Sequence, residues 1–373
     1  MKRLVLVGGG HSHLLVLDRL RRRPPAHAEI VLVNPAPLAV YSGMIPGLIA
    51  GEYEYRACHI ALAPLAAAAG ACFIVDRAIA LDPSRRQVIL QGGRLLEYDL
   101  LSLDIGSDSP PIPGEPADAI EIVPAKPMEP FLQTMQALWA RARKGGLNRM
   151  AVVGGGAAGV ELALALHYRM NRASGTRVAM ALVSDAHRLV PERGAATGQA
   201  VQRLCRRRGV ALVLGAPADV SFRGVTVGGQ GTLDAQAVIW ATGAAAAQWI
   251  RNTGLATDAQ GFVAINGSLQ SRSHPEVFAA GDCASNADTP WPKSGVSAVR
   301  QGPVLAANLL RALAGHPLDA FRFSPHALAI LNCGGRYALA SWRGAALEGR
   351  WVWRWKHGLD RRFMRRFEPP RGR

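Results

Sequence analysis

The chain has 373 residues, 49% of them hydrophobic and 19% charged, which is enough to build two or three domains with real cores. Its 40 glycines and 24 prolines follow no short repeat, which excludes collagen-like and coiled-coil structures. The 43 Lys and Arg residues exceed the 27 Asp and Glu residues by 16, and this excess favours anionic partners such as nucleotide phosphates, nucleic acid or an acidic membrane surface.

No segment is typical of secretion, membrane spanning or metal binding. The start, MKRLVLVGGG, is basic and apolar, but the apolar run is short and breaks into glycines without a cleavage site. The longest apolar stretch, residues 60–75, contains Pro64 and Gly70 and is shorter than a membrane span. The five cysteines form no CxxC or CxxxxC motif, so neither a zinc site nor a disulfide framework nor a redox dithiol is indicated. We therefore expect a cytoplasmic protein without a metal site.

The same unit occurs twice along the chain, about 146 residues apart. Each copy has an apolar strand, three glycines, a helix and a second strand: residues 3–7, 8–10, 11–23 and 29–33, then residues 149–153, 154–156, 161–170 and 176–183. This order is typical of the opening of a doubly wound nucleotide-binding fold.

The second copy carries a full GxGxxG motif. Gly154 makes the tight turn, Gly156 lets the backbone approach a pyrophosphate, and Gly159 lets helix and strand pack closely, with Glu161 just beyond. Its second strand ends ALVSDAHR, so the ribose is read at Ser184 or Asp185. Asp185 favours the 2′-hydroxyl of NADH, whereas Ser184 with Arg188 tolerates a 2′-phosphate, and the balance leans slightly to NADH.

The first copy departs from the motif. Gly8 and Gly10 fit, but His13 stands where the third glycine belongs, which requires a wider gap between helix and strand. The second strand ends at Asn34, whose amide can still bond a ribose hydroxyl. His11 and His13 also raise the alternative of a metal site, but no third cluster of ligands accompanies them.

The remaining sequence indicates how the domains are arranged. A connector with seven prolines covers residues 109–130, and strands at 210–214 and 237–240 lead into WATGA, which contains Gly243. EVFAAGDCA, residues 276–284, is read as a strand ending in Gly281 and Asp282, where the first domain returns. We predict an α/β protein with two doubly wound, Rossmann-like domains, the second inserted in the first, plus a small C-terminal region. The predicted bounds are 1–130 with 255–321, then 131–254, then 322–373.

Together these motifs resemble the FAD/NAD(P)-dependent pyridine nucleotide-disulfide oxidoreductase superfamily over roughly residues 1–315. The finer resemblance is to its NADH dehydrogenase-like branch, and within it to the module fused to the N-terminus of selenide, water dikinase. The segments that carry it are GGGHSH at 8–13, YSGMIPGLIAG at 41–51, YDLLSLDIGS at 98–107 and PKSGVSAVRQGP at 292–303.

The resemblance implies FAD and NAD(P)H as cofactors and a set of site residues. Pro46 would lie beside the flavin ring, and Lys293 and Gln301 would bound a helix start that stabilises negative charge on the reduced flavin. The alternative for Lys293 is an ordinary solvated surface lysine. The FAD-binding positions implied are Gly8, Gly10, His11, Asn34, Asp104, Gly106, Gly281, Asp282, Ser297 and Ala298. The NAD(P)H-binding positions implied are Gly154, Gly156, Gly159, Glu161, Ser184, Asp185 and Gly243.

The departures leave the electron acceptor open. Disulfide reductases need a CxxxxC pair, whereas Cys58 and Cys72 are too far apart in the sequence. Sulfide:quinone oxidoreductases resemble PKSG at 292–295 but use a set of cysteines, and Cys333 has no evident partner. Type II NADH:quinone oxidoreductases carry AQxxxQQG where this chain has Val296, Arg300 and Gln301.

The tail combines aromatic and basic residues. Residues 350–373 contain nine basic and two acidic side chains, a net charge of +7. An apolar residue recurs every four positions, at Trp351, Trp355, Leu359, Phe363 and Phe367. Such a helix fits an anionic membrane surface or packing on the protein's own domains or a second subunit. We expect no nucleic-acid partner, because no recognition motif accompanies the charge.

The sequence thus predicts an FAD-dependent oxidoreductase that takes hydride from NAD(P)H and passes electrons to an acceptor such as a quinone. It would be cytoplasmic or peripheral on the inner face of the cell membrane. Two alternatives stay open. One is a low-turnover flavin-binding partner or redox sensor linked to selenium metabolism, and the other is an enzyme like sulfide:quinone oxidoreductase.

Overall fold

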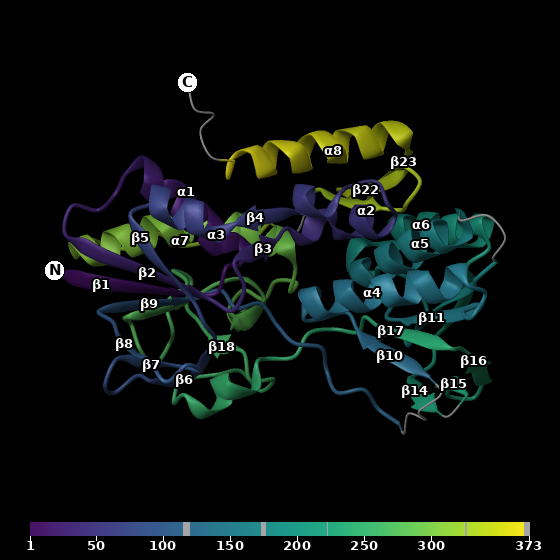
Figure 1. Cartoon of the computed structure of the whole chain (residues 1–373), viewed down its shortest axis with the longest axis horizontal. Coiled ribbons are helices and arrows are strands. Elements are labelled where there is room, and N and C mark those ends of the chain that lie inside the picture. Colours follow the sequence, from purple (N-terminus) through teal and green to yellow (C-terminus); the bar gives the residue numbers. More distant parts are fainter. Residues whose placement is uncertain (115–119, 173–176, 222, 325–326, 369–373) are drawn as a thin grey trace.

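A computed structural model of the protein describes residues 1–114, 120–172, 177–221, 223–324 and 327–368. The chain forms two lobes side by side, each built on a parallel five-stranded sheet, and a long C-terminal helix lies across both (Figure 1). In the part of the chain that is described, no helix has the length and apolar character needed to cross a membrane.

The first sheet takes strands from two distant parts of the chain. Its strand order is β19-β9-β1-β2-β5, and all neighbours run parallel. The strands are β1 (Lys2–Val7), β2 (Ala28–Asn34), β5 (Ala71–Val75), β9 (Leu100–Leu103) and β19 (Val277–Ala279). β1 is central because its side chains from Leu4 to Val7 are apolar and buried, as a strand covered on both faces requires. The helices of this lobe are α1 (His11–Arg22), α3 (Leu62–Ala68) and α7 (Gly295–Ala314).

The second sheet has the order β10-β17-β11-β12-β13, again parallel throughout. Its strands are β10 (Glu121–Pro124), β11 (Arg149–Val153), β12 (Ala179–Ser184), β13 (Ala211–Leu214) and β17 (Ala237–Trp240). Its helices are α4 (Met128–Arg143), α5 (Ala157–Arg172) and α6 (Ala195–Arg208). In each lobe a strand–glycine–helix–strand unit supplies two central parallel strands, which confirms the doubly wound α/β fold.

Smaller elements complete the lobes. Three-stranded antiparallel sheets are formed by β6 (Ala78–Asp82), β7 (Gln87–Leu90) and β8 (Leu95–Glu97), and by β14 (Ala218–Ser221), β15 (Gly224–Val227) and β16 (Gly231–Asp234). Two-stranded pairs are formed by β3 (Leu38–Val40) with β4 (His59–Ala61), and by β18 (Val263–Ala264) with β20 (Ala284–Ser285). A short helix, α2 (Ile45–Ile49), follows a 3-10 turn at Ser42–Met44.

The C-terminal region is a third antiparallel sheet followed by the crossing helix. The sheet consists of β21 (Ala329–Asn332), β22 (Ala338–Trp342) and β23 (Ala345–Gly349), and the helix is α8 (Arg350–Arg365). β21 and β23 contact α5 and α6 of the second lobe. Phe363 in the last turn of α8 and Phe367 just after the helix join the core of the first lobe. The tail therefore links the two lobes.

Two expectations need correction. The connector expected over residues 109–130 contains β10, and α4 already begins at Met128, because the prolines bound a short edge strand instead of preventing one. The apolar stripe of the tail is also not one face. Trp351, Trp355 and Leu359 are exposed while Phe363 and Phe367 are buried, since a step of four residues advances 400° and drifts round the helix. The domain bounds themselves stay a prediction.

Candidate functional site

The two glycine turns lie at the carboxyl ends of β1 and β11, where each strand leads into a helix. Gly8 has φ +97° and Gly154 has φ +133°, and a Cβ on either would overlap the backbone of Asp104 or Ala241. A Cβ on Gly159 would overlap the Gly154 carbonyl. Only glycine permits this left-handed conformation and this close approach of helix and strand.

The second glycine of each turn meets a different environment. A Cβ on Gly156 would meet no atom within 4 Å in the described part of the chain, so the backbone there is open to a ligand. A Cβ on Gly10 would overlap the carboxylate of Asp104. The carboxylate of Asp104 thus packs against the first turn, whereas the space beside Gly156 in the second turn is open to a phosphate.

Asp104 is buried at the end of β9 and accepts a hydrogen bond from the backbone N–H of His13 at 3.0 Å. Burial raises the pKa of Asp104 to about 7, although the N–H groups of His13 and Ser12 act against that rise. Gly281 packs so close to the same carboxylate that a Cβ would touch it. Asp104 therefore joins the first glycine turn to the loop after β19.

His13 explains how the first unit dispenses with its third glycine. The ring is buried and bonds the Gly8 carbonyl through Nδ1 at 2.7 Å and the Ser102 hydroxyl through Nε2 at 2.8 Å. Burial lowers the pKa of His13 to about 4, so it stays neutral at pH 7. It bridges α1, β1 and β9. No group of three metal-ligating side chains occurs among the described residues.

Asn34 braces the glycine turn. Its side-chain oxygen accepts from the Gly9 N–H at 2.8 Å, and its amide nitrogen donates to the Ala36 carbonyl at 2.7 Å. Both ends of the side chain are already bonded, so a bond to a ribose hydroxyl has to use a second lone pair of the oxygen.

Asp282 belongs to a polar cluster that joins the lobes. The Lys126 ammonium, between β10 and α4, lies 2.8 Å from an Asp282 oxygen and donates to the Ser107 hydroxyl at 2.7 Å. The Ser107 hydroxyl is 3.3 Å from the same Asp282 oxygen. Gly106, before Ser107, has φ +74° with open space around it.

Gln301 and Lys293 flank this loop from α7 and the segment before it. The fully buried Gln301 accepts from the Gly281 N–H at 2.7 Å, while its Nε2 is buried without a partner among the described residues. The Lys293 ammonium donates to the Ala284 carbonyl and lies 3.8 Å from the centroid of the Phe262 ring. Burial lowers the pKa of Lys293, so it is not the ordinary surface lysine that its sequence position allows.

The start of α7 meets the start of α1 and the segment before α2. The buried Ser12 hydroxyl donates to the Ala298 carbonyl at 2.8 Å, and Ser294 caps α7 by accepting from the Ser297 N–H. The Ser42 N–H donates to His11 Nε2 at 3.3 Å, and burial lowers the pKa of His11 to about 4. Pro46 is buried in the first turn of α2 directly after this segment.

A second cluster of charged groups lies where α8 crosses α2 and α5. The buried Lys356 ammonium donates to Asp360 at 2.7 Å and to the Gly43 carbonyl at 2.6 Å. The Tyr41 hydroxyl donates to the other oxygen of Asp360 at 3.2 Å. Glu161 accepts from the Asn332 N–H at 2.7 Å, and burial raises the pKa of Glu161 to about 7 against the charge of Lys356. Glu161 thus faces the C-terminal region and not the glycine turn.

The ribose-reading positions lie at the end of β12. Ser184 is buried, and its hydroxyl accepts from the Ala186 N–H at 3.2 Å. Asp185 and Arg188 are both exposed on the following turn. Gly243, with φ +47°, follows β17 at the same edge of the sheet.

The cysteines form no disulfide, although the Cys283 thiol donates to the Leu103 and Ala280 carbonyls beside the Gly281–Asp282 loop. All five are free, and only Cys72 is exposed. Burial raises the pKa of the thiols of Cys58, Cys205 and Cys283 to about 12, which keeps them protonated and weakly nucleophilic.

The arrangement fits two dinucleotides, one at the carboxyl end of each sheet. The open backbone at Gly156 suits a pyrophosphate. The Gln301 Nε2, buried without a partner among the described residues, can donate a hydrogen bond to a bound cofactor. Motif reading missed Lys126, Tyr41, Lys356 and Asp360. Tyr41 begins the segment YSGMIPGLIAG but was given no role there, and only the basic pattern of the tail indicated the region of Lys356.

Comparisons with known proteins identify the family and the fold. Residues 2–302 match the family described as pyridine nucleotide-disulphide oxidoreductase. The demethylphylloquinone reductase of Synechocystis sp. is 25% identical over 369 residues, covering 93% of this chain and 88% of that protein. An NADH dehydrogenase-like protein of Mycobacterium tuberculosis is 25% identical over 355 residues, covering 91% and 87%. The solved sulfide:quinone oxidoreductase of Aquifex aeolicus superposes with a TM-score of 0.82 at 20% identity, over 98% of this chain and 91% of that one, which shows the shared fold.

Proposed function

The chain belongs to the pyridine nucleotide-disulphide oxidoreductase family, within its NADH dehydrogenase-like branch, and on that premise we propose that it is a quinone reductase. It is an FAD-dependent oxidoreductase that uses NAD(P)H. The overall reaction would be NAD(P)H + H⁺ + quinone → NAD(P)⁺ + quinol. When bound, FAD supplies a ring that accepts a hydride and gives up two electrons.

The observation that supports a quinone acceptor is the cluster in which buried Lys356 and Asp360 meet half-buried Tyr41 and Glu161. Reduction of a quinone by two electrons consumes two protons, whereas a one-electron iron–sulfur acceptor consumes none. Glu161, whose pKa is about 7, exchanges a proton at neutral pH, and Lys356 lies close enough for its charge to act on that carboxyl. A site with a carboxyl group that can donate a proton near pH 7 therefore suits a quinone better than an iron–sulfur acceptor.

The other site residues would hold and orient the cofactors. Gly8, Gly10, Asp104 and Asp282 would hold FAD at the first sheet, with Pro46, Lys293 and Gln301 around its ring. Gly154, Gly156 and Gly159 would receive the NAD(P)H pyrophosphate, and Ser184 and Asp185 its ribose. No side chain of this set has to act as an acid or base for the hydride step, since positioning is the main task.

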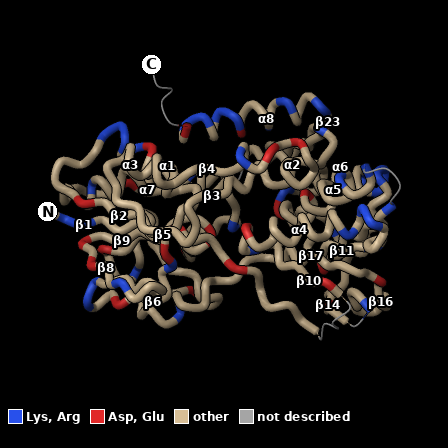
Figure 2. Tube along the Cα trace, in the orientation of Figure 1, with Lys and Arg blue, Asp and Glu red and all other residues tan. Residues whose placement is uncertain are grey.

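The outer face of α8 supports attachment to a membrane, where quinones dissolve. Trp351, Trp355 and Leu359 are 53%, 40% and 45% exposed, and Trp342 beside them is 50% exposed. Lys and Arg residues recur along the same helix (Figure 2). Exposed tryptophans among arginines match the headgroup level of an anionic membrane. We propose that the protein is peripheral and docks on the membrane through α8. The alternative is that a second subunit covers this face of the helix.

An anaerobic titration with NADH and NADPH tests the proposal. We expect rapid bleaching of the flavin by the nicotinamide nucleotide, and then rapid reoxidation by a soluble quinone analogue but not by an iron–sulfur protein. Slow bleaching would instead favour the redox-sensor alternative. Reduction of the flavin by sulfide would favour the sulfide-oxidising alternative. If the iron–sulfur protein reoxidises the flavin as fast as the quinone analogue does, the proposal that a quinone is the electron acceptor is contradicted.

A further inference from the structure

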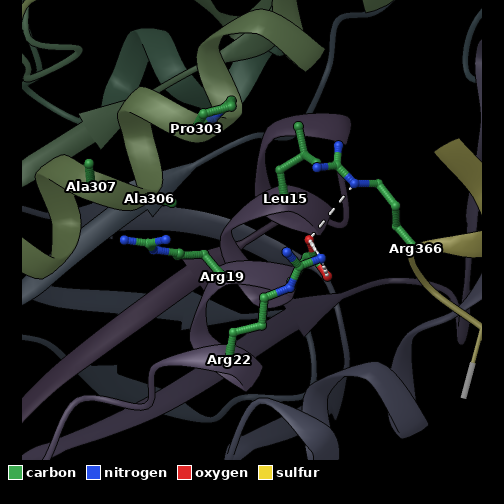
Figure 3. A pocket seen from close by; sticks show the side chains of 8 residues that line it. Leu15, Arg19, Arg22, Pro303, Ala306, Ala307 and Arg366 are labelled. Carbon is green, nitrogen blue, oxygen red and sulfur yellow. Dashed lines mark hydrogen bonds and ion pairs between the residues drawn. The ribbon is translucent and has the colours of Figure 1, made fainter. Parts of the chain in front are cut away.

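A groove of about 310 Å³ lies between α1, α7 and the end of α8, apart from the cofactor sites. The side chains that line it come from all three helices (Figure 3). They are Leu15, Asp18, Arg19, Arg22, Pro303, Ala306, Ala307 and Arg366. None of these residues is used by the proposed reaction.

The lining is strongly basic. Arg19, Arg22 and Arg366 stand against Asp18 alone, so three positive charges and one negative charge leave a net charge of +2. The Asp18 carboxylate is already paired with two arginines. The Arg22 guanidinium lies 2.8 Å from one of its oxygens, and the guanidinium of Arg21, which does not line the groove, lies 2.7 Å from the other. In the described part of the chain the Arg19 guanidinium has no hydrogen bond or ion pair. The groove thus has more guanidinium groups than its own carboxylate can neutralise.

One wall of the groove is apolar. Leu15 on α1 and Ala306 on α7 are buried, while Pro303 and Ala307 of α7 remain partly accessible. The two helices approach so closely that a Cβ on Gly302 would overlap the Leu15 side chain, which makes the wall rigid. A ligand that fits both walls carries an anionic group and an apolar part.

The groove lies at the end of the exposed face of α8. Arg366 is the C-cap of α8 and follows Leu359 by seven residues. The backbone carbonyl of Arg366 accepts from Arg21, and its guanidinium is 4.0 Å from Asp18, which holds the end of α8 against α1. The groove therefore lies at the C-terminal end of α8, whose exposed Trp351, Trp355 and Leu359 precede it along the helix.

We propose that this groove binds the phosphate of an anionic phospholipid headgroup, with the glycerol and upper acyl chain against Leu15, Pro303 and Ala307. This inference rests on the proposed docking of α8 and names the lipid chemistry that the docked protein selects. Guanidinium groups pair with phosphate oxygens in bidentate fashion, and the unpaired Arg19 is free to do so. A free phosphate would leave the apolar wall uncovered, whereas a lipid whose headgroup lies at the membrane surface covers it.

The test compares flotation of the FAD-loaded protein on phosphatidylcholine vesicles with and without phosphatidylglycerol. We expect the double variant R19Q/R22Q to lose about tenfold in partitioning to the anionic vesicles and to keep its weak binding to the neutral ones. In this variant Asp18 keeps Arg21 as its partner. The matched control R85Q/R94Q removes the same charge from the β6–β8 sheet, far from α8 in Figure 1, and should behave as the unmodified protein. Ala307→Trp, which fills the groove without a charge change, should repeat the loss.

The outcomes separate this inference from the docking on which it rests. If both arginine double variants lose binding equally, only net charge matters and the groove is not a site. If R19Q/R22Q and Ala307→Trp bind the anionic vesicles as the unmodified protein does, the groove proposal fails while docking stands. If the unmodified protein floats with neither kind of vesicle, the proposed docking fails, and this inference fails with it. If inorganic phosphate without lipid raises the Tm of the unmodified protein but not of R19Q/R22Q, the ligand is a free anion and the lipid is wrong.

Discussion

The Lys126 ammonium contacts the Asp282 carboxylate at 2.8 Å although 156 positions separate them in the sequence. Lys126 belongs to the second lobe, next to β10, and Asp282 to the loop that follows β19 of the first. Both side chains are mostly buried, with 29% and 16% of their surface exposed. The pair therefore positions the loop that would hold the flavin relative to the neighbouring lobe.

Asp282→Ala should cause loss of flavin. The substitution leaves Lys126 without its carboxylate and removes the acceptor that would bind FAD, which costs about 1–3 kcal/mol, or roughly fivefold to 150-fold in affinity. Lys126→Met should weaken the binding of FAD less than Asp282→Ala does, because the Ser107 hydroxyl still faces the Asp282 carboxylate. The flavin-to-protein ratio after dialysis measures both. Full retention of FAD by folded Asp282→Ala would show that this carboxylate does not bind it.

Replacement of all five cysteines should leave reduction of the flavin by NAD(P)H intact. The thiols are free, and burial keeps those of Cys58, Cys205 and Cys283 protonated. Small apolar replacements are suitable because these three side chains fill the core. Stopped-flow reduction of the folded fivefold variant and of each single variant is the measurement, with Cys72→Ser as the exposed control. A folded variant whose flavin NADH no longer reduces would mean that a thiol takes part.

The glycine motifs made the fold predictable from sequence. Gly154 and Gly159 each allow a backbone approach that no other residue permits, so their spacing determines the strand–turn–helix geometry. His13 was the exception. The gap expected at this position is real, but the ring fills it with bonds to Gly8 and Ser102, and no pattern in the local sequence identifies Ser102 as the partner.

The second charged cluster could not be predicted. Tyr41 and Glu161 lie on different lobes and meet Lys356 and Asp360 only because α8 crosses both. Periodicity predicted an amphipathic helix there, yet which face is buried depends on the angle at which α8 leaves β23. That angle is a tertiary property. The four-residue spacing therefore places Phe363 and Trp355 in one apolar stripe, although Phe363 is buried and Trp355 is exposed.

Asp185→Asn should shift the nicotinamide preference towards NADPH. Asp185 is exposed on the turn where the ribose is read, and its charge repels a 2′-phosphate by about 1 kcal/mol, roughly fivefold. Arg188 on the same turn remains available to the phosphate. The ratio of kcat/KM for NADPH and NADH measures the shift, with Asp219→Asn on β14 as the control for net charge. An unchanged ratio would assign the choice to Ser184.

Lys356→Met should destabilise the fold more than the double replacement Lys356→Met with Asp360→Leu. Among the described residues, loss of the lysine leaves buried Asp360 with the Tyr41 hydroxyl as its one hydrogen-bond partner, which costs about 3–5 kcal/mol. An apolar pair of similar volume avoids that unpaired charge. Thermal unfolding measures the order of the three Tm values. A double variant that is less stable than the single one would show that the pair itself stabilises the tail.

The reduction of quinone should fall as the pH rises through about 7, and Glu161 should be the cause. Burial raises the pKa of Glu161 to that value, so the carboxyl holds a proton below pH 7 and has lost it above. If it supplies a proton to the quinone, the rate with the acceptor falls with its protonated fraction. Glu161→Gln keeps an oxygen that can accept from the Asn332 N–H but holds no titrating proton. We expect it to be slower at acid pH, by about 10²-fold if the proton limits the rate, and to show no step near pH 7.

Reduction of the flavin by NAD(P)H separates this role from a structural one. That step needs no proton from Glu161, so its rate in Glu161→Gln should match the unmodified protein at every pH. The matched control is Glu129→Gln, an exposed carboxylate on α4 that bonds Tyr55 away from the cluster, which should retain the pH profile. A Glu161→Gln variant that still loses activity through pH 7 would move the titrating group elsewhere, with buried Asp104, whose pKa is also about 7, as the next residue to replace.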